Sequence, residues 1–328
     1  MSETRYEIKR GDAGDVLSSP QEIKDGSIDC VVTSPPYYNL RSYDNHEQLG
    51  REDTPEKFVE NLVGGVFNNI HRVLKDDGTV WINLGDSYGS DKSLIGIPWM
   101  VAFAMKEAGW ILRQDIIWSK PNPMPESVQD RCTKSHEYIF MFSKNRKYYY
   151  DSDAVKEPLA DSSIARAERF QNAKKKYGGS PERPTSKHCK NGIDQSCAFA
   201  GLASGRSKGY DTESGMRNRR TVWTVSKRSF KGAHFAVYPP QLIEPCILAG
   251  CPKGGVVLDP FSGSGTTGVV SINNGRNYIG IEINPAYIEM SRQRIENECS
   301  KNRIKDKSPA FQWEQHKEAR SAQEDVEN

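Results

Sequence analysis

The segment that most constrains the fold is a buried strand that runs directly into a glycine turn and then into a helix. Val256–Asp259 is apolar and ends in an acidic residue, and Gly263 and Gly265 form the turn before a helix expected over 266–274. Glycine suits this turn because it has no Cβ, so the backbone can bend sharply and approach a ligand closely. A further strand at 278–283 and a helix at 285–298 continue the alternation.

The amino-terminal half alternates in the same way. Residues 27–33 predict a short buried strand that leads into Ser34-Pro35-Pro36-Tyr37, where the prolines end the strand because neither can donate to a ladder. Helices are expected at 54–74 and 98–108, and strands at 79–84, 110–118 and 137–142. This pattern predicts an α/β fold with an open, mostly parallel sheet. Such sheets bind ligands beyond the carboxyl ends of their strands, so Ser34 and Asp259 are expected at one edge.

Charge is distributed unevenly over the 328 residues. The formal net charge is only +2, but residues 166–231 hold 16 Lys or Arg against 5 Asp or Glu. The rest of the chain is therefore acidic. A basic block of this kind, rich in Gly and Ser and with little periodicity, predicts a surface that binds a polyanion. A solvated loop with a chance excess of lysine is the alternative.

Cysteine spacing and hydropathy exclude several classes of protein. The seven cysteines are odd in number and form no paired CxxC set, so we expect neither a disulfide framework nor a metal site. No apolar run reaches the roughly 18 residues that a membrane-spanning helix needs. The polar start at residues 1–5 leads into no apolar signal core. We therefore expect a cytoplasmic protein with no membrane partner.

An acidic residue follows the glycine turn at a spacing that favours a nucleoside ligand. Glu282 ends the expected strand 17 residues after Gly265. A carboxylate there can accept hydrogen bonds from both ribose hydroxyls. The turn is neither a P-loop, since no Gly-Lys-Ser/Thr follows, nor a GxGxxG fingerprint. A purely structural turn is the alternative interpretation.

Four segments resemble the amino-methylating DNA methyltransferases. Asp259 to Thr267 (DPFSGSGTT) is similar to the S-adenosylmethionine-binding motif of that family, and 278–283 to the strand that carries its ribose-binding acid. Residues 234–239 resemble the segment lining the methionine end of the cofactor, and 11–15 the turn that approaches the adenine. The resemblance implies a Rossmann-like sheet that binds S-adenosylmethionine. It implies these cofactor-binding residues: Asp12, His234, Asp259, Phe261, Ser262, Gly263, Gly265, Thr266 and Glu282.

Ser34, Pro35, Pro36 and Tyr37 resemble the catalytic motif of the same family. The exocyclic amine of cytosine is a poor nucleophile, because its lone pair is delocalised into the ring. Ser34 Oγ and the Pro35 carbonyl can accept the amine hydrogens out of plane, which stabilises the transition state and positions the nitrogen. Tyr37 offers a flat face for stacking an extruded base. Serine in the first position usually accompanies cytosine N4 methylation in this family, and Asp or Asn adenine methylation.

The order of the motifs resembles the β-class of the family, in which the sheet is circularly permuted. The catalytic half would occupy 1–150, a target-recognition region 151–232, the cofactor-binding half 233–298 and a polar tail 299–328. Within these parts, residues 94–99 resemble a helix start of the family; an ordinary apolar helix start is the alternative. Residues 120–125 resemble a loop that borders the base pocket, or are a proline-rich connector. Residues 219–223 resemble the return from the recognition region into the main sheet, or are a basic loop that leads into a strand.

The resemblance implies a site-specific enzyme that methylates cytosine N4 in double-stranded DNA as part of a restriction–modification system. Its partners would be DNA and a restriction endonuclease acting separately, and it would be a monomer or homodimer. Adenine N6 methylation, an RNA or protein amine methyltransferase, and a catalytically silent DNA-binding protein stay open as alternatives. Lysines and arginines at 174–176, 217–220 and 227–228 are expected to neutralise DNA phosphates.

Overall fold

The computed structural model describes residues 4–39, 49–160, 162–163, 165, 210–211, 215–226 and 238–306. The chain divides into two compact units. The larger comprises Met1–Asp151 and Thr221–Asn328, and the smaller Ser152–Arg220.

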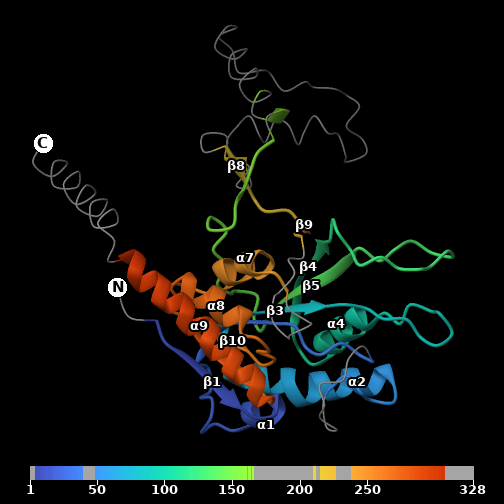
Figure 1. The fold of residues 1–328 in the computed structure, drawn as a ribbon, viewed down its shortest axis with the longest axis horizontal. Coiled ribbons are helices and arrows are strands. Elements are labelled where there is room, and N and C mark those ends of the chain that lie inside the picture. Colours follow the sequence, from blue (N-terminus) through green and yellow to red (C-terminus); the bar gives the residue numbers. More distant parts are fainter. Residues whose placement is uncertain are drawn as a thin grey trace, which may run out of the picture. The chain divides into compact units, whose positions relative to one another are not determined.

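An eight-stranded mixed sheet forms the centre of the larger unit (Figure 1). Its order is β1-β11-β10-β2-β3-β5-β4-β9, and neighbouring strands are parallel except where β5 pairs with β3 and with β4. The predicted open, mostly parallel sheet is therefore confirmed. The strands are β1 (Tyr6–Arg10), β2 (Ile28–Thr33), β3 (Leu74–Leu84), β4 (Ile111–Ser119), β5 (His136–Ser143), β9 (Val222–Thr224), β10 (Val256–Asp259) and β11 (Asn277–Glu282).

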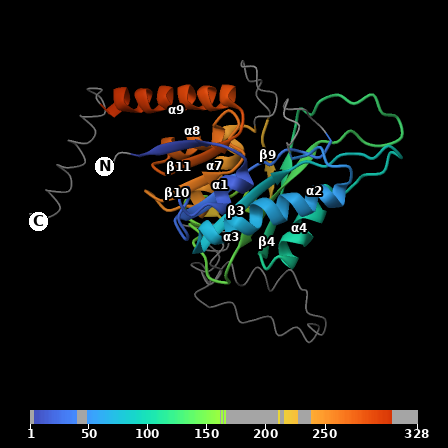
Figure 2. The ribbon, with the colours of Figure 1, turned by 90° about the horizontal axis from the view of Figure 1, so that it is seen from below.

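Helices cover both faces of this sheet (Figure 2). One face carries α1 (Ala13–Ser18), α2 (Pro55–Asn61), the π-helical turn η1 (Leu62–Phe67), α3 (Asn68–Val73) and α4 (Ile97–Glu107). The other carries α7 (Pro240–Gly250), α8 (Thr266–Asn273) and α9 (Pro285–Asp306). The predicted helix at 54–74 is confirmed as the continuous run from α2 to α3. The last helix extends eight residues beyond its predicted end at 298, and residues 307–328 lie outside the described residues.

Burial explains why the central strands are apolar throughout. All six residues of β2 are buried, because helices pack on both sides of a parallel sheet. On the α1–α4 face, the fully buried rings of Phe58 and Phe67 belong to the same core cluster as Phe140 and Phe142 of β5. Each such ring contributes roughly 1.5–3 kcal/mol on leaving water. This rigid core fixes where the strands end, and therefore where the residues of the edge lie.

The smaller unit contains a three-stranded antiparallel sheet in the order β6-β8-β7 (Glu157–Pro158, Met216–Arg217, Tyr210–Asp211). The guanidinium groups of Arg217 and Arg220 both donate to Glu157 Oε1, at 2.9 and 2.6 Å. Burial opposes ionisation of Glu157, but the two arginines outweigh it and lower its pKa. Part of the positive charge predicted for phosphate contacts at 217–220 is thus balanced within the unit. The lysines at 174–176 and the basic pair at 227–228 lie outside the described residues.

After the smaller unit, the chain re-enters the main sheet through β9. The segment 219–223 was expected to lead back into the main sheet, and β9 does pair with β4 there as a parallel edge strand. Among the described residues no helix combines the length and apolar character needed to cross a membrane. Within the same residues no three His, Cys, Asp or Glu side chains gather as metal ligands would.

Candidate active site

The two predicted motifs meet at the carboxyl edge of the sheet. β2 ends at Thr33 and its parallel neighbour β10 ends at Asp259, so Ser34 follows one strand and the glycine turn follows the other. Thr33 Oγ1 donates a hydrogen bond of 2.7 Å to Asp259 Oδ1, across a sequence separation of 226 residues. The expectation that Ser34 and Asp259 lie at one edge is confirmed.

Asp259 is the hub that joins these elements. Its side chain is buried and accepts hydrogen bonds from the Thr267 hydroxyl (2.5 Å), the Tyr238 hydroxyl (3.2 Å) and the Phe261 backbone N–H (3.1 Å), besides that of Thr33. Burial raises the pKa of Asp259, and the donors offset part of that effect. These bonds hold β2, β10, α8 and Tyr238 in one arrangement. Asp259 therefore positions the glycine turn through contacts with protein groups.

The glycine turn has the geometry that its sequence predicted. Gly263 and Gly265 have φ angles of 51° and 75°, in the left-handed region that favours glycine. A Cβ on Gly265 would lie 2.1 Å from Ser291 Oγ, so the turn also needs glycine for packing against α9. The neighbouring Ser262 is buried, and its hydroxyl accepts a 2.8 Å hydrogen bond from Tyr278. The turn is held firmly at the start of α8.

Glu282 stands at the end of β11, beside this turn. Its Oε2 accepts from Gly263 N–H and its Oε1 from Asn284 N–H, each at 2.8 Å. The backbone N–H of Ile283 also stabilises the carboxylate; since a carboxylate offers about four acceptor sites, these three donors do not use them all. Burial raises the pKa of Glu282. The Gly11 N–H donates to the Glu282 backbone carbonyl at 3.2 Å, which brings the amino-terminal turn to the same edge.

Asp12 lies in that amino-terminal turn, where it caps α1. Its carboxylate accepts from the backbone N–H groups of Gly14 (2.8 Å) and Asp15 (3.3 Å), as an N-cap residue does. Asp12 thus fixes the turn that was expected to approach an adenine. His234, another predicted cofactor residue, lies outside the described residues.

Thr266 is the first residue of α8 and is buried, and its hydroxyl accepts a hydrogen bond from an arginine that the sequence did not predict at this site. The Arg294 guanidinium on α9 donates to the Ser264 carbonyl (2.5 Å), the Ser264 hydroxyl (2.7 Å) and Thr266 Oγ1 (3.3 Å). No local pattern marks Arg294, because it is one of many polar residues on a long helix. It holds the glycine turn from the side of α9.

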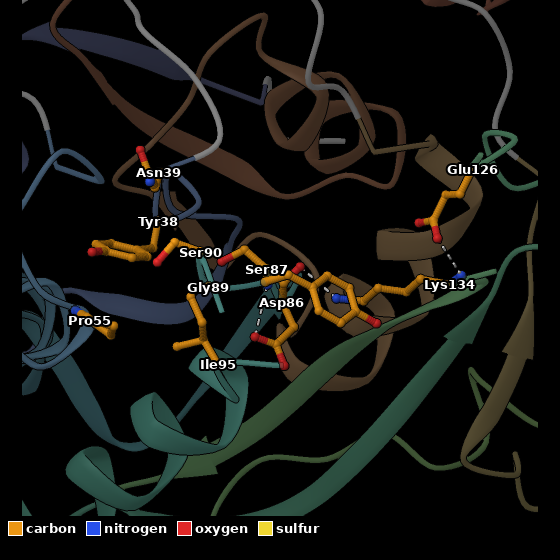
Figure 3. A pocket seen from close by; sticks show the side chains of 11 residues that line it. Tyr38, Asn39, Pro55, Asp86, Ser87, Gly89, Ser90, Ile95, Glu126 and Lys134 are labelled. Atoms are coloured by element: carbon orange, nitrogen blue, oxygen red, sulfur yellow. Dashed lines mark hydrogen bonds between the residues drawn. The ribbon is translucent and has the colours of Figure 1, made fainter. Parts of the chain in front are cut away.

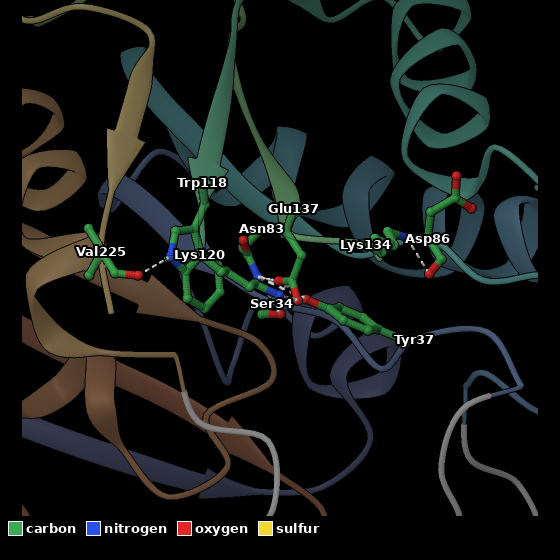
Figure 4. A network of polar contacts seen from close by, with 9 residues as sticks. All are labelled: Ser34, Tyr37, Asn83, Asp86, Trp118, Lys120, Lys134, Glu137 and Val225. Carbon is green, nitrogen blue, oxygen red and sulfur yellow. Dashed lines mark hydrogen bonds and ion pairs between the residues drawn. The ribbon is translucent and has the colours of Figure 1, made fainter. Parts of the chain in front are cut away.

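The Ser34–Tyr37 motif is tied to the end of β3 and the start of β5 (Figure 4). The Tyr37 hydroxyl donates to Glu137 Oε2 at 2.7 Å. The Asn83 amide nitrogen lies 2.9 Å from the Tyr37 hydroxyl, 3.0 Å from Glu137 Oε2 and 3.4 Å from Ser34 Oγ. A Cβ on Gly85 would lie 2.5 Å from Tyr37 Cε2, so the ring packs directly over that glycine. Ser34 and Tyr37 are partly exposed at this edge.

A buried ion pair lies behind Tyr37. The Lys120 ammonium, at the end of β4, pairs with Glu137 Oε1 and sits 4.5 Å from the centroid of the Trp118 ring. The Trp118 indole N–H in turn donates to the Val225 carbonyl at 2.8 Å, just after β9. Burial alone would raise the pKa of Glu137, but the Lys120 charge and the hydrogen bonds from Lys120, Tyr37 and Asn83 lower it. Glu137 is therefore an anion held among donors.

Comparison with known proteins identifies the family. A family model described as DNA methylase (N6/N4 methyltransferases) matches residues 28–293, most of the chain. The chain belongs to this DNA methylase family. Among curated relatives of the methylase, the type II methyltransferase M.Cfr9I of Citrobacter freundii is 41% identical over 313 residues, covering 87% of each protein. M.SmaI of Serratia marcescens is 39% identical over 310 residues, covering 86% of the methylase and 89% of the relative.

Solved structures share the fold of the methylase. The PvuII DNA methyltransferase, described as cytosine-N4-specific, matches with a TM-score of 0.59 and 19% identity, over 91% of the methylase and 92% of that chain. A DNA modification methylase of Thermus thermophilus, TTHA0409, solved with S-adenosyl-L-methionine, matches with a TM-score of 0.56 and 22% identity, over 90% and 96%. At these identities the likeness concerns the fold.

A polar pocket of about 540 Å³ opens next to the Ser34–Tyr37 motif of the methylase (Figure 3). The Lys134 ammonium in this pocket donates to the Asp86 carbonyl at 2.6 Å, and burial lowers the pKa of Lys134. The Asp86 carboxylate accepts from the N–H groups of Gly96 and Ile97, which caps α4. The predicted helix start at 94–99 is thereby confirmed. The lining residues are Tyr38, Asn39, Pro55, Asp86, Ser87, Tyr88, Gly89, Ser90, Ile95, Glu126 and Lys134.

Proposed function

We propose that this methylase transfers a methyl group from S-adenosyl-L-methionine to the N4 amine of a cytosine extruded from double-stranded DNA. One observation carries the proposal. The Ser34–Tyr37 motif and the glycine turn of 259–267 stand at adjacent strand ends, joined by the Thr33–Asp259 hydrogen bond. An amine-binding turn and a nucleoside-binding turn are thus neighbours, as a direct transfer between two bound molecules requires.

The residues around the glycine turn fit S-adenosylmethionine. Glu282 keeps acceptor capacity for the ribose hydroxyls beyond its backbone donors. Gly263 and Gly265 leave the backbone of the turn without side chains, and Asp12 fixes the neighbouring turn. Phe261 is partly exposed beside them. When bound, the cofactor supplies a methyl group activated by the positive charge of its sulfonium.

The catalytic motif then prepares the amine. Ser34 Oγ and the Pro35 carbonyl accept the amine hydrogens, which draws the lone pair out of conjugation with the ring and onto the nitrogen. The acceptors are already fixed in place by the Pro35-Pro36 turn, so they lower the barrier without reorganising. Tyr37 stacks on the base, and its ring is held by Gly85 and Glu137.

The choice of cytosine over adenine follows from the neutrality of Ser34. Cytosine presents its amine next to N3, a ring acceptor. A hydroxyl can accept from the amine and donate to a ring nitrogen, whereas an ionised carboxylate can only accept. Adenine N1 presents a similar acceptor, which keeps adenine N6 as the second candidate. The PvuII neighbour, a cytosine-N4-specific enzyme, supports the first.

DNA recognition is proposed to reside in the region 151–232, between the catalytic part (1–150) and the cofactor part (233–298). Its 166–231 block is strongly basic, with 16 Lys or Arg against 5 Asp or Glu, while the rest of the chain is acidic. The curated relatives are named type II methyltransferases. We propose accordingly that the methylation protects DNA from a restriction endonuclease that acts separately.

The test is product identification. The enzyme is incubated with labelled S-adenosylmethionine and duplex DNA, the DNA is digested, and the methylated nucleoside is identified by mass. We expect N4-methylcytosine, and its loss in Ser34→Ala with cofactor binding retained. N6-methyladenine alone would overturn the choice of base but leave a DNA methyltransferase. Label on RNA or protein, with none on DNA, would overturn the proposal as a whole.

A further inference from the structure

A chain of buried polar groups connects Lys120 to the catalytic serine. The Lys120 ammonium contacts Glu137 Oε1, Glu137 Oε2 accepts from Asn83 and Tyr37, and the Asn83 amide reaches Ser34 Oγ (Figure 4). Lys120 and Glu137 are only 8% and 9% exposed, and Asn83 only 4%. Asn83 belongs to β3 and Glu137 to β5, and Lys120 directly follows β4, at the edge that carries Ser34.

Stability alone does not account for this arrangement. Taking a lysine and a glutamate out of water costs several kcal/mol per ion, and an apolar pair of similar volume is often as stable. The Asn83 carbonyl oxygen is buried and has no hydrogen-bond partner among the described residues. An unsatisfied buried acceptor costs about 1–3 kcal/mol. Buried polar groups kept at such a cost cluster at functional sites.

The contacts fix the direction of each hydrogen bond. Glu137 as an anion can only accept, so the Tyr37 hydroxyl and the Asn83 amide must both donate to it. Rotating the Asn83 amide by a half turn would place its carbonyl oxygen against this carboxylate. The amide nitrogen therefore faces Glu137, the Tyr37 hydroxyl (2.9 Å) and Ser34 Oγ (3.4 Å), and its two hydrogens are shared among these three acceptors.

This direction determines what Ser34 can offer a base. A serine hydroxyl has one donor and two acceptor sites. With one acceptor site facing Asn83, one acceptor site and the O–H are left. That pair matches the N4 amine and the N3 lone pair of cytosine, which lie next to each other.

We propose that Glu137 and Asn83 are positioning residues for methyl transfer: Glu137, balanced by Lys120, holds Tyr37 and the Asn83 amide, and Asn83 orients the Ser34 hydroxyl. Neither residue takes a proton from the base. The inference rests on the proposed roles of Ser34 and Tyr37. Trp118 anchors the outer end of the chain, since its ring lies against the Lys120 ammonium and its indole N–H binds the Val225 carbonyl.

The experiment separates positioning from folding by varying the acceptor while the ion pair is removed. In the Lys120→Met background, Glu137→Gln keeps an oxygen for Tyr37 and Asn83, whereas Glu137→Leu keeps none. Steady-state rates are measured over a range of S-adenosylmethionine and duplex DNA concentrations, which gives kcat and both KM values. We expect the Leu variant to lose about tenfold to a hundredfold in kcat, with KM for both substrates unchanged, and the Gln variant to recover most of it.

Asn83→Leu is the independent arm, because it keeps the volume and removes the donor to Ser34. It should lower kcat to a similar extent without raising KM. Thr79→Val is the matched control: Thr79 is a buried polar residue on the same strand, hydrogen-bonded to the Gly250 carbonyl away from the site. We expect its kcat to be that of the wild type. Melting temperatures are recorded for all variants.

The outcomes distinguish this inference from the proposed function. If Ser34→Ala abolishes turnover while Asn83→Leu and the Glu137→Leu double variant keep wild-type kcat, the positioning chain is wrong and the catalytic serine stands. Equal kcat for the Gln and Leu variants at position 137 would also overturn it. If Ser34→Ala keeps its turnover, the proposed catalytic site itself fails.

Discussion

Cofactor affinity should depend on the carboxylate of Glu282. Truncation to alanine removes the acceptor of two proposed ribose hydrogen bonds, and also the partner of Gly263 N–H and Asn284 N–H. A net loss of about 1–3 kcal/mol is expected for such bonds. Since each 1.4 kcal/mol is a factor of ten, the Kd for S-adenosylmethionine should rise about fivefold to 150-fold.

Titration calorimetry measures this Kd directly, and thermal melting without cofactor reports whether the turn is still folded. Glu289→Ala is the matched control, because Glu289 is an exposed acid on the following helix whose carboxylate contacts only Gln293 in the described structure. Its affinity should equal that of the wild type. An unchanged Kd for a folded Glu282→Ala variant would refute the ribose assignment.

The pH dependence of S-adenosylmethionine affinity is a second test of the role of Glu282. Burial, with a smaller contribution from the charge of Asp259, raises the pKa of Glu282. The ionised form is the one that accepts from two hydroxyls, so affinity should be complete above the raised pKa and fall as the pH drops through it. A pH series that descends from above this raised pKa toward the ordinary range of a glutamate should show the loss in the wild type. The loss should be absent in Glu282→Ala, and the same slope in both proteins would assign the effect to another group.

Three further predictions concern the packing of Tyr37, the Asp259 hub and the basic block. Gly85→Ala places a methyl group against the Tyr37 ring and should lower kcat about tenfold to a hundredfold with little change in melting temperature. The control is Gly64→Ala, which should leave kcat unchanged because a Cβ there meets no atom within 4 Å. Asp259→Ala leaves several buried donors without an acceptor and should destabilise the fold by about 3 kcal/mol or more in chemical denaturation. Replacing the three lysines at 174–176 with alanine should flatten the fall of DNA affinity with salt, and an unchanged slope would place these lysines away from DNA.

The glycine turn and its place between strand and helix could be predicted from the sequence because their determinants are local. Strand, glycine turn and helix follow one another within 256–274, and the positive φ angles of Gly263 and Gly265 are properties of single residues. The position of Glu282 followed from strand spacing. What the sequence did not show is that Asp259 is enclosed by protein donors, since these come from β2, α8 and Tyr238.

The polar chain behind Tyr37 could not be predicted, because strand order and register create it. Asn83, Glu137 and Lys120 sit at the ends of three apolar strands, where a polar residue usually meets solvent. Because β5 runs antiparallel to β3 and β4, the start of β5 and the ends of the other two strands share one edge. A one-residue shift of register would turn each side chain to the opposite face. The proline-rich segment at 120–125 was predicted to be a loop bordering the base pocket. Its first residue, Lys120, instead forms the buried ion pair with Glu137.

Two buried carboxylates fix the two halves of the site, and each fixes a different feature. Asp259 gathers donors from the elements around the glycine turn, and so holds that turn at one distance from Ser34. Glu137 gathers donors around the catalytic motif, and so sets the direction in which Ser34 and Tyr37 present their hydroxyls. Methyl transfer between two bound molecules requires both, since a nitrogen at the right distance with its lone pair delocalised into the ring does not react. Substitution of Asp259 should therefore lower stability and cofactor affinity, whereas substitution of Glu137 should lower kcat.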